Sequence, residues 1–218
     1  MTGLDLSNRN IKKMNQRIIQ EAAELFFKKG IRAVTMNDVA DALGISKRTL
    51  YEHFHNKEEL LRECLKHHYQ SHKKQIEQLE EEASNPVDIM HRHFRYHVIR
   101  INEYHPNFAQ ELQKLHPNIW NTLVAELVED REKYTMDLIS EGVRQGYFRE
   151  DTDSWVASKM LFAHVDLLSD TDTFPPERIP RSDLFRQIIT SFLRGLSTEK
   201  GFKEVENLFY NPKHESYV

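Results

Sequence analysis

Apolar residues recur along this chain with the period of α-helices, and polar or glycine-containing breaks separate the apolar stripes. From Ile11 onward, apolar side chains fall every three or four positions, as one face of a helix requires. The stripe ends at Lys28, Lys29 and Gly30, where cations suit the negative end of a helix and a glycine can take the left-handed cap. The pattern predicts a helix over residues 10–29.

Two much shorter helices are predicted next. Thr35 and Asp38 have the capping-box spacing, in which the hydroxyl and the carboxylate each satisfy a free backbone amide. The helix that they open ends at Gly44, and Ser46 is a favoured N-cap for another helix over residues 47–54. Two short helices therefore flank a three-residue turn.

The remaining chain has the pattern of long helices with polar or proline-led starts. Asn56 is the expected cap of a polar helix that reaches about residue 82. Proline suits the first turn of a helix, where its missing N–H leaves no bond unmade. Further helices are expected over residues 86–104, 106–115, 117–145, 153–169 and 182–196, with a loop over 170–180. The sequence shows no internal repeat and no strand-like alternation, so the chain is predicted to be all-α.

Composition agrees with a helical protein of the cytoplasm. Apolar residues make up 39% of the 218 residues and charged residues 29%, with only seven Gly and seven Pro. The first ten residues lack an apolar signal segment, and no run approaches the roughly 18 apolar residues of a membrane span. The single cysteine, Cys64, excludes an intrachain disulfide, and its ordinary role is that of a small buried apolar side chain.

Charge is distributed unevenly along the chain. The net charge of −4 would by itself argue against a nucleic-acid partner. Residues 1–54, however, hold nine Lys/Arg and six Asp/Glu, a net of +3, whereas residues 55–218 hold 21 and 28, a net of −7. A basic head on an acidic body fits a protein that touches DNA with its N-terminal part alone.

Residues 35–54 meet the demands of a helix-turn-helix. Reading DNA requires a short helix in the major groove, held at a fixed angle by a partner helix. Ala40 is small where two helices must cross closely, Gly44 supplies the turn, and Leu50 is expected to point inward as an anchor. The side chains left to face outward are Lys47, Arg48, Thr49, Glu52 and His53.

The motifs of this segment resemble the DNA-binding head of the tetracycline-repressor (TetR) family. The likeness covers residues 11–62 and is specific because the order and spacing of several motifs agree. These motifs are Ala22-Ala-Glu-Leu-Phe26 with Gly30, Thr35-Met-Asn-Asp-Val-Ala40, Leu43-Gly-Ile-Ser46, Thr49-Leu-Tyr-Glu-His-Phe54 and Lys57-Glu-Glu-Leu-Leu61. The resemblance implies a DNA-binding domain at residues 1–56 and a helical regulatory and dimerisation domain at 57–218.

The resemblance also implies roles for individual residues. Phosphate contacts are expected from Tyr51 and His53, and from three residues at helix N-termini, where the dipole attracts anions: Thr35, Ser46 and Lys57. The expected base readers are Asn37, Lys47, Arg48 and Thr49. Other interpretations stay open. Thr35 and Ser46 are helix caps in any case, Tyr51 could pack against the first helix, and Lys47 and Arg48 could form a merely solvated face.

A homodimer is expected from the C-terminal part. Gly142-x-x-x-Gly146-x-Phe148, followed by Asp151 and Asp153, resembles the join into the last two long helices of the family, which form a four-helix dimer interface. Two-fold symmetry doubles the DNA contacts that one short helix can make. The apolar stripes could instead be ordinary core. The expected interface residues are Trp155, Met160, Leu161, Val165, Leu168, Phe185, Ile188, Ile189 and Phe192.

By the same resemblance, the body should hold a pocket whose occupant changes DNA affinity. Its aromatic and aliphatic content favours an apolar or aromatic effector. The candidate lining is Phe94, Val98, Ile101, Phe108, Trp120 and Leu123. The chain also has twelve histidines, and the pairs His68/His72 and His93/His97 have the i, i+4 spacing of two metal ligands. Neither pair has an obvious third ligand, so neither a metal nor a cofactor is predicted.

The predicted function is therefore that of a transcriptional regulator, in the family's commoner mode a repressor, which binds a pseudo-palindromic operator. An enzyme is not expected, because the sequence contains no His-Glu-x-x-His, Gly-x-Ser-x-Gly or phosphate-binding glycine loop. A helical scaffold that uses the helix-turn-helix only as a packing unit is the remaining alternative, and it predicts no affinity for DNA.

Overall fold

The computed structural model describes residues 3–100, 103–170 and 172–210. Within these ranges the chain forms helices and turns, with one isolated β-bridge between Phe148 and Ser197. The prediction of an all-α fold is confirmed. None of the described helices is both long enough and apolar enough to span a bilayer.

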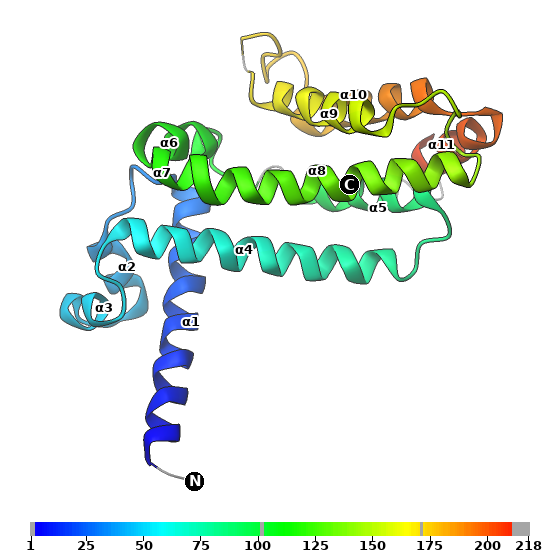
Figure 1. Ribbon diagram of the computed structural model, residues 1–218. Helices are drawn as coiled ribbons and strands as arrows, with labels where there is room; N and C mark the ends of the chain where they lie inside the picture. The colour runs from blue at the N-terminus through cyan, green and yellow to red at the C-terminus, as the bar shows by residue number, and fades with distance from the viewer. Residues whose placement is uncertain (1–2, 101–102, 171, 211–218) are drawn as a thin grey trace. The chain divides into compact units, whose positions relative to one another are not determined.

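The helices group into two compact units (Figure 1). The first unit comprises residues 1–74 and 103–125, and the second comprises 75–102 and 126–218. The first contains α1 (Gly3–Lys29), α2 (Met36–Leu43), α3 (Lys47–His53), most of α4 (Lys57–Glu80), α6 (Phe108–Leu115), α7 (Pro117–Ile119) and a π-helical turn (Trp120–Val124). The second contains α5 (Pro86–Arg100), nearly all of α8 (Ala125–Arg144), α9 (Ser154–Asp166) with a 3₁₀ turn (Leu167–Ser169), α10 (Arg181–Leu196) and α11 (Glu199–Tyr210). Packing thus joins residues 103–125 to the N-terminal helices.

The boundary predicted between a DNA-binding domain at residues 1–56 and a regulatory domain at 57–218 concerns function, and it stays a prediction.

The core of the first unit follows the predicted apolar stripe of α1. Ile18 and Phe26 are fully buried, as are Val39 of α2 and Leu50 of α3. The helix itself begins at Gly3 rather than near residue 10. Ile11, the first residue of the stripe, is 49% exposed. The N-terminal part of α1 extends past α2 and α3 (Figure 1).

Residues 103–125 are attached to the first unit by long-range contacts. The His105 N–H donates to the Phe27 carbonyl at 2.6 Å, and the Arg32 N–H donates to the Glu111 carboxylate at 2.9 Å. Leu112 and Ile119 are buried at 2% and 0% exposure. Apolar burial and hydrogen bonding therefore both hold this segment against the α1–α2 connection.

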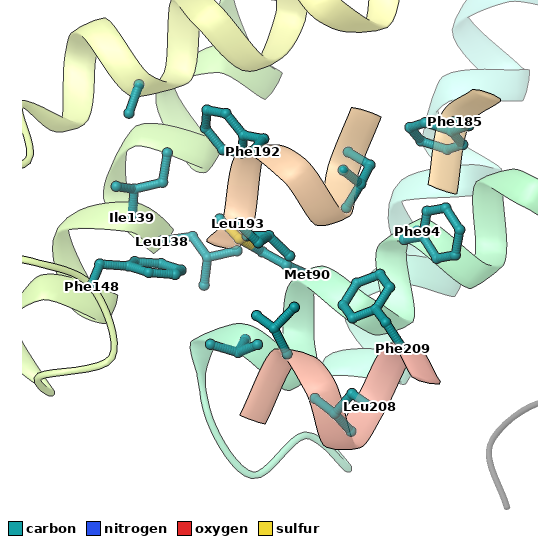
Figure 2. Packing of buried hydrophobic residues seen from close by; sticks show 14 residues of the cluster. Met90, Phe94, Leu138, Ile139, Phe148, Phe185, Phe192, Leu193, Leu208 and Phe209 are labelled. Atoms are coloured by element: carbon teal, nitrogen blue, oxygen red, sulfur yellow. The ribbon is translucent and has the colours of Figure 1, made fainter. Parts of the chain in front are cut away.

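The second unit is built around a cluster of fourteen buried residues drawn from α5, α8, α9, α10 and α11, together with Phe148 (Figure 2). The Phe94 ring lies 5.2 Å from that of Phe185 and 5.3 Å from that of Phe209 between centroids, distances at which aromatic pairs attract. Gly142 is required by the packing of Phe148, because a Cβ at this position would lie 2.3 Å from the ring. The glycine of the predicted Gly142-to-Phe148 motif is thus a packing feature of this core.

Helix α11 is absent from the sequence-based prediction. It follows Thr198, whose hydroxyl accepts a hydrogen bond from the Gly201 N–H at 3.2 Å. Val205, Leu208 and Phe209 are its buried positions, spaced by three and one. The stretch predicted as one helix over 117–145 is divided into α7, the π-helical turn and α8. The predicted loop over 170–180 is confirmed as turns in its described residues.

Candidate nucleic-acid interface

Helix α2 begins and ends through bonds within its own sequence. The Thr35 Oγ1 accepts from the Asp38 N–H at 3.3 Å, and the Asp38 carboxylate accepts from the Thr35 N–H at 2.7 Å, so the predicted capping box is confirmed. These hydrogen bonds from Thr35 hold the pKa of the Asp38 carboxyl below its usual value. Gly44 ends the helix with φ of 65°, in the left-handed region that glycine enters without strain. The entry and the exit of α2 are both locally determined.

Helix α3 is fixed by one cap and one anchor. The Ser46 Oγ accepts from the Thr49 N–H at 3.0 Å, which confirms the predicted N-cap. Leu50 has no exposed surface, so its predicted role as an inward anchor is also confirmed. Ala40, 2% exposed, lies on α2, which packs against α3. The two helices therefore form a rigid pair whose other faces point away from the core.

The exposed face of α3 is polar and carries two cations. The Arg48 side chain is 89% exposed, and its Nε donates to Glu52 Oε1 at 3.2 Å within the helix. The Lys47 ammonium lies 5.9 Å from the centroid of the Tyr51 ring, which is 40% exposed. Asn37 of α2 is exposed as well. An exposed ion pair of this kind is weak, so Arg48 can exchange Glu52 for another partner at little cost.

Two residues that were predicted to contact phosphate form hydrogen bonds inside the first unit instead. The His53 ring shares a hydrogen bond with the Asn15 amide oxygen of α1. The Lys57 ammonium donates to the Ile31 carbonyl, and burial lowers the pKa of Lys57, although the nearby Glu111 and Asp38 raise it. Lys57 therefore fastens the start of α4 to the α1–α2 connection, a role that the sequence did not reveal.

A shallow hollow lies at the start of α4. Its lining consists of Asn56, Lys57, Glu58, Glu59 and Arg62. Because two carboxylates face this hollow, it is poorly suited to an anion such as phosphate. The α3 face, in contrast, carries the exposed cations Lys47 and Arg48.

The predicted dimer residues fall into two groups within the second unit. On α9, Trp155 is 60% exposed and Met160 is 49% exposed, and Val156 beside them is 42% exposed. In contrast, Phe185, Ile189 and Phe192 of α10 belong to the buried core, and Leu161, Val165 and Leu168 pack against it. Ile188 is half-buried. Of the predicted dimer residues, Trp155 and Met160 are therefore the two that are exposed to solvent.

The predicted pocket residues are not brought together in one unit. Phe94 and Val98 belong to the second unit, where Phe94 is part of the core. Phe108, Trp120 and Leu123 belong to the first, and the Phe108 ring lies 4.8 Å from that of Phe27. Ile101 lies outside the described residues. A common lining for these side chains is therefore still a prediction.

The histidine pairs are occupied by other partners. His93 Nε2 lies 2.6 Å from Glu80 Oε1, and His68 Nε2 lies 2.8 Å from the Tyr104 hydroxyl. Burial would raise the pKa of Glu80, but hydrogen bonds from His93 and Tyr134 outweigh it and lower the pKa. Among the described residues, no three His, Cys, Asp or Glu side chains are grouped so that they could hold a metal ion. Cys64 is buried, as predicted, and burial raises the pKa of its thiol.

Comparison with known proteins identifies the helix-turn-helix segment. Residues 18–64 match the family described as bacterial regulatory proteins, tetR family. The chain belongs to the TetR family. This TetR-family protein is a DNA-binding transcriptional regulator, and the family resemblance noted in the sequence is confirmed.

Relatives and solved structures extend the likeness over most of the chain. The HTH-type transcriptional repressor KstR2 of Mycobacterium tuberculosis is 27% identical over 139 residues, which are 62% of this chain and 70% of that protein. A TetR-family regulator from Cytophaga hutchinsonii has the same fold, with a TM-score of 0.72 at 17% identity, over 88% of this chain and 98% of that one. A transcriptional regulator from Saccharomonospora viridis in complex with choline gives 0.73 at 18% identity, over 86% and 100%. These names describe regulators of transcription rather than enzymes.

Proposed function

We propose that this TetR-family regulator represses transcription in the cytoplasm by binding a pseudo-palindromic operator as a homodimer. The observation that carries the proposal is the exposed face of α3, a short helix fixed at both ends and anchored by the fully buried Leu50. A helix of this size fits the major groove, which admits one α-helix. The KstR2 relative, which is named as a repressor, supports the sign of regulation.

Base recognition is assigned to the exposed side chains of Asn37, Lys47 and Arg48 and to the half-buried Thr49. Lys47 and Arg48 can donate to guanine, Asn37 can pair with adenine, and the Thr49 methyl can meet that of thymine. Phosphate contacts are assigned to the hydroxyls of Thr35, Ser46 and Tyr51. His53 and Lys57 serve first to hold the first unit together, and their phosphate contacts are secondary in this proposal.

Dimerisation is assigned to the apolar surface of α9. Trp155, Val156 and Met160 are large apolar side chains that lie on one helix and are at least two-fifths exposed. A self-complementary patch of this kind is what a two-fold interface requires, because the same surface serves both subunits. Trp and Met are also enriched in protein interfaces.

An effector is expected to shift the equilibrium between DNA-competent and incompetent states, through unequal affinity for the two. The apolar and aromatic content of the body favours an apolar or aromatic effector. The relatives do not identify it: one similar structure is of a ketosteroid transcriptional regulator and another contains choline. These two chemistries differ, so neither is transferred to this chain.

The test combines selection of duplexes from a random pool with sedimentation of the purified protein. We expect a dimer that enriches an inverted repeat. Arg48→Ala should bind the selected duplex about 1–3 kcal/mol more weakly and tolerate more base changes. Arg144→Ala is the matched control, because Arg144 is 77% exposed on α8 and also pairs with a glutamate of its own helix.

The outcomes separate the competing functions. A monomer that enriches no duplex at low salt would support a helical scaffold and contradict the proposal. Equal losses for Arg48→Ala and Arg144→Ala would show that α3 has no special part in recognition.

A further inference from the structure

The N-terminal half of α1 carries a concentrated positive charge. Residues 8–17 include Arg9, Lys12, Lys13 and Arg17, and they contain no Asp or Glu. The whole protein has a net charge of −4, whereas this segment of ten residues has a net charge of +4. These four residues are nearly half of the nine Lys and Arg that precede residue 55.

The basic segment is solvent-exposed. All side chains from Asn8 to Lys13 are exposed, and among the described residues neither Lys12 nor Lys13 has an ion-pair partner. The other polar side chains of this stretch, Asn8 and Asn10, are uncharged hydrogen-bond donors and acceptors. A face on which Lys12 and Lys13 lie beside uncharged amides is suited to a polyanion.

Two contacts tie this segment to the helix-turn-helix. Asn15 shares a hydrogen bond with His53, the last residue of α3, and the Arg17 guanidinium donates to the Leu43 carbonyl at the end of α2 at 3.0 Å. From Asn15, α1 continues past α3 toward its N-terminus (Figure 1). At 1.5 Å per residue, Arg9 lies about 9 Å and Gly3 about 18 Å beyond Asn15.

We propose that residues 8–13 of α1 form a second DNA-binding element, which contacts the phosphate backbone flanking each half-site through Lys12 and Lys13 with Arg9. This inference rests on the proposed function, because it needs α3 to be seated on DNA. With α3 in the groove, residues 13 to 8 lie about 3 to 11 Å beyond Asn15, a reach that corresponds to about one to three base pairs at 3.4 Å per base pair along the axis. The element therefore lengthens the footprint of each subunit without reading bases.

This element precedes residues 18–64, the range that matches the tetR family description. That range begins at Ile18, where α1 enters the core. The proposal accordingly depends on this chain's own residues. It also explains why a helix with an exposed Ile11 extends so far without packing: its partner is the operator.

The test measures how affinity for the selected duplex depends on salt, between about 50 and 200 mM. Each phosphate contact contributes about 0.9 to the slope of log affinity against log salt. Lys12→Ala/Lys13→Ala should lower the slope by about 3.6 for a dimer and weaken binding at least about tenfold, equally on all sequences. Lys73→Ala/Lys74→Ala is the control, since it removes two exposed lysines from the distant part of α4. Circular dichroism establishes that both variants are folded.

Duplex length provides the second measurement. Wild-type protein should bind a duplex that extends about ten base pairs beyond the half-sites more tightly than one that ends at them. The Lys12/Lys13 variant should show no such preference. This proposal would be overturned by an unchanged salt slope, or by an equal loss of DNA affinity in the Lys12/Lys13 and Lys73/Lys74 variants. Neither result would affect the proposal that α3 binds the operator. Failure of the wild-type protein to bind any duplex would instead refute the proposed function.

Discussion

Two segments of the first unit, residues 35–54 and residues 103–125, are held in opposite ways. In the first segment, the caps of α2 and α3 are bonds between residues three apart, Thr35 with Asp38 and Ser46 with Thr49. In the second segment, the bond from Arg32 to Glu111 spans 79 residues. The helix-turn-helix is thus shaped mainly by its own sequence, whereas residues 103–125 take their place only when distant parts of the chain meet.

This difference assigns different tasks to the two segments. A locally capped pair of helices keeps its shape while other parts of the protein move, as a DNA reader requires. A segment that depends on long-range bonds near Gly30 and Lys57 can, in contrast, respond to changes elsewhere in the fold. The predictions that follow test this contrast, beginning with the largest effect.

Ile119→Ala should lower the free energy of unfolding by about 2–5 kcal/mol, because Ile119 is fully buried and the surroundings cannot close the cavity. Ile99→Ala is the matched control, since Ile99 is 58% exposed and should change stability by less than about 0.5 kcal/mol. Urea denaturation followed by circular dichroism measures both. Similar small losses would mean that residues 103–125 are not part of the core.

Glu111→Ala should lower the free energy of unfolding by about 1–2 kcal/mol, because it removes the carboxylate that accepts a hydrogen bond from the Arg32 N–H. The pKa of Lys57 should fall further, since the Glu111 charge raises it. The exposed Glu129 of α8 provides the control, Glu129→Ala. A Lys57 pKa that does not change, followed by NMR titration, would contradict the coupling between this segment and α4.

Thr35→Ala should lower the free energy of unfolding by about 1 kcal/mol, which is the usual effect of removing an N-cap side chain. Thr35→Ser keeps the hydroxyl and should restore most of the loss. Because the cap is local, hydrogen exchange should become faster in α2 and stay unchanged in α6. Faster exchange in both helices would show that the two segments do not differ as described.

The smallest effect concerns pH. The pKa of Asp38 is lowered in the folded state by its bonds to Thr35, so its contribution to stability is complete above the unfolded value of 3.8 and is lost as pH falls through the folded value. The stability difference between wild-type protein and Asp38→Asn should therefore shrink in acid. A difference that is independent of pH would contradict the role of the carboxylate.

The same contrast explains what the sequence could predict. The starts of α2 and α3 were predicted because Thr35, Asp38 and Ser46 act on residues close by. The start of α1 at Gly3 was missed, because the apolar stripe begins only at Ile11. Helix α11 was missed although Thr198 caps it, because the helix depends on burying Val205, Leu208 and Phe209 in a core formed by distant helices.

The candidate site divides along the same line. Exposure of Lys47, Arg48 and Glu52 follows from the helical period of α3 and was predicted. The engagement of Lys57 with Ile31 and of His53 with Asn15 depends on how α1 packs, which the local pattern does not contain. For the same reason, the exposed Trp155 and Met160 could not be separated from the other predicted dimer residues, which lie in the core or are partly buried.

The most direct test of the central claim, that α3 reads bases in the major groove, is a double-mutant cycle between Arg48 and the operator. Wild-type protein and Arg48→Ala are each titrated against duplexes that carry single base-pair changes. We predict one position in each half-site where a base-pair change lowers the binding free energy of wild-type protein by about 1–3 kcal/mol but leaves that of Arg48→Ala unchanged. At all other positions, a base-pair change should weaken binding equally in both proteins. Identical costs at every position in both proteins would contradict the claim.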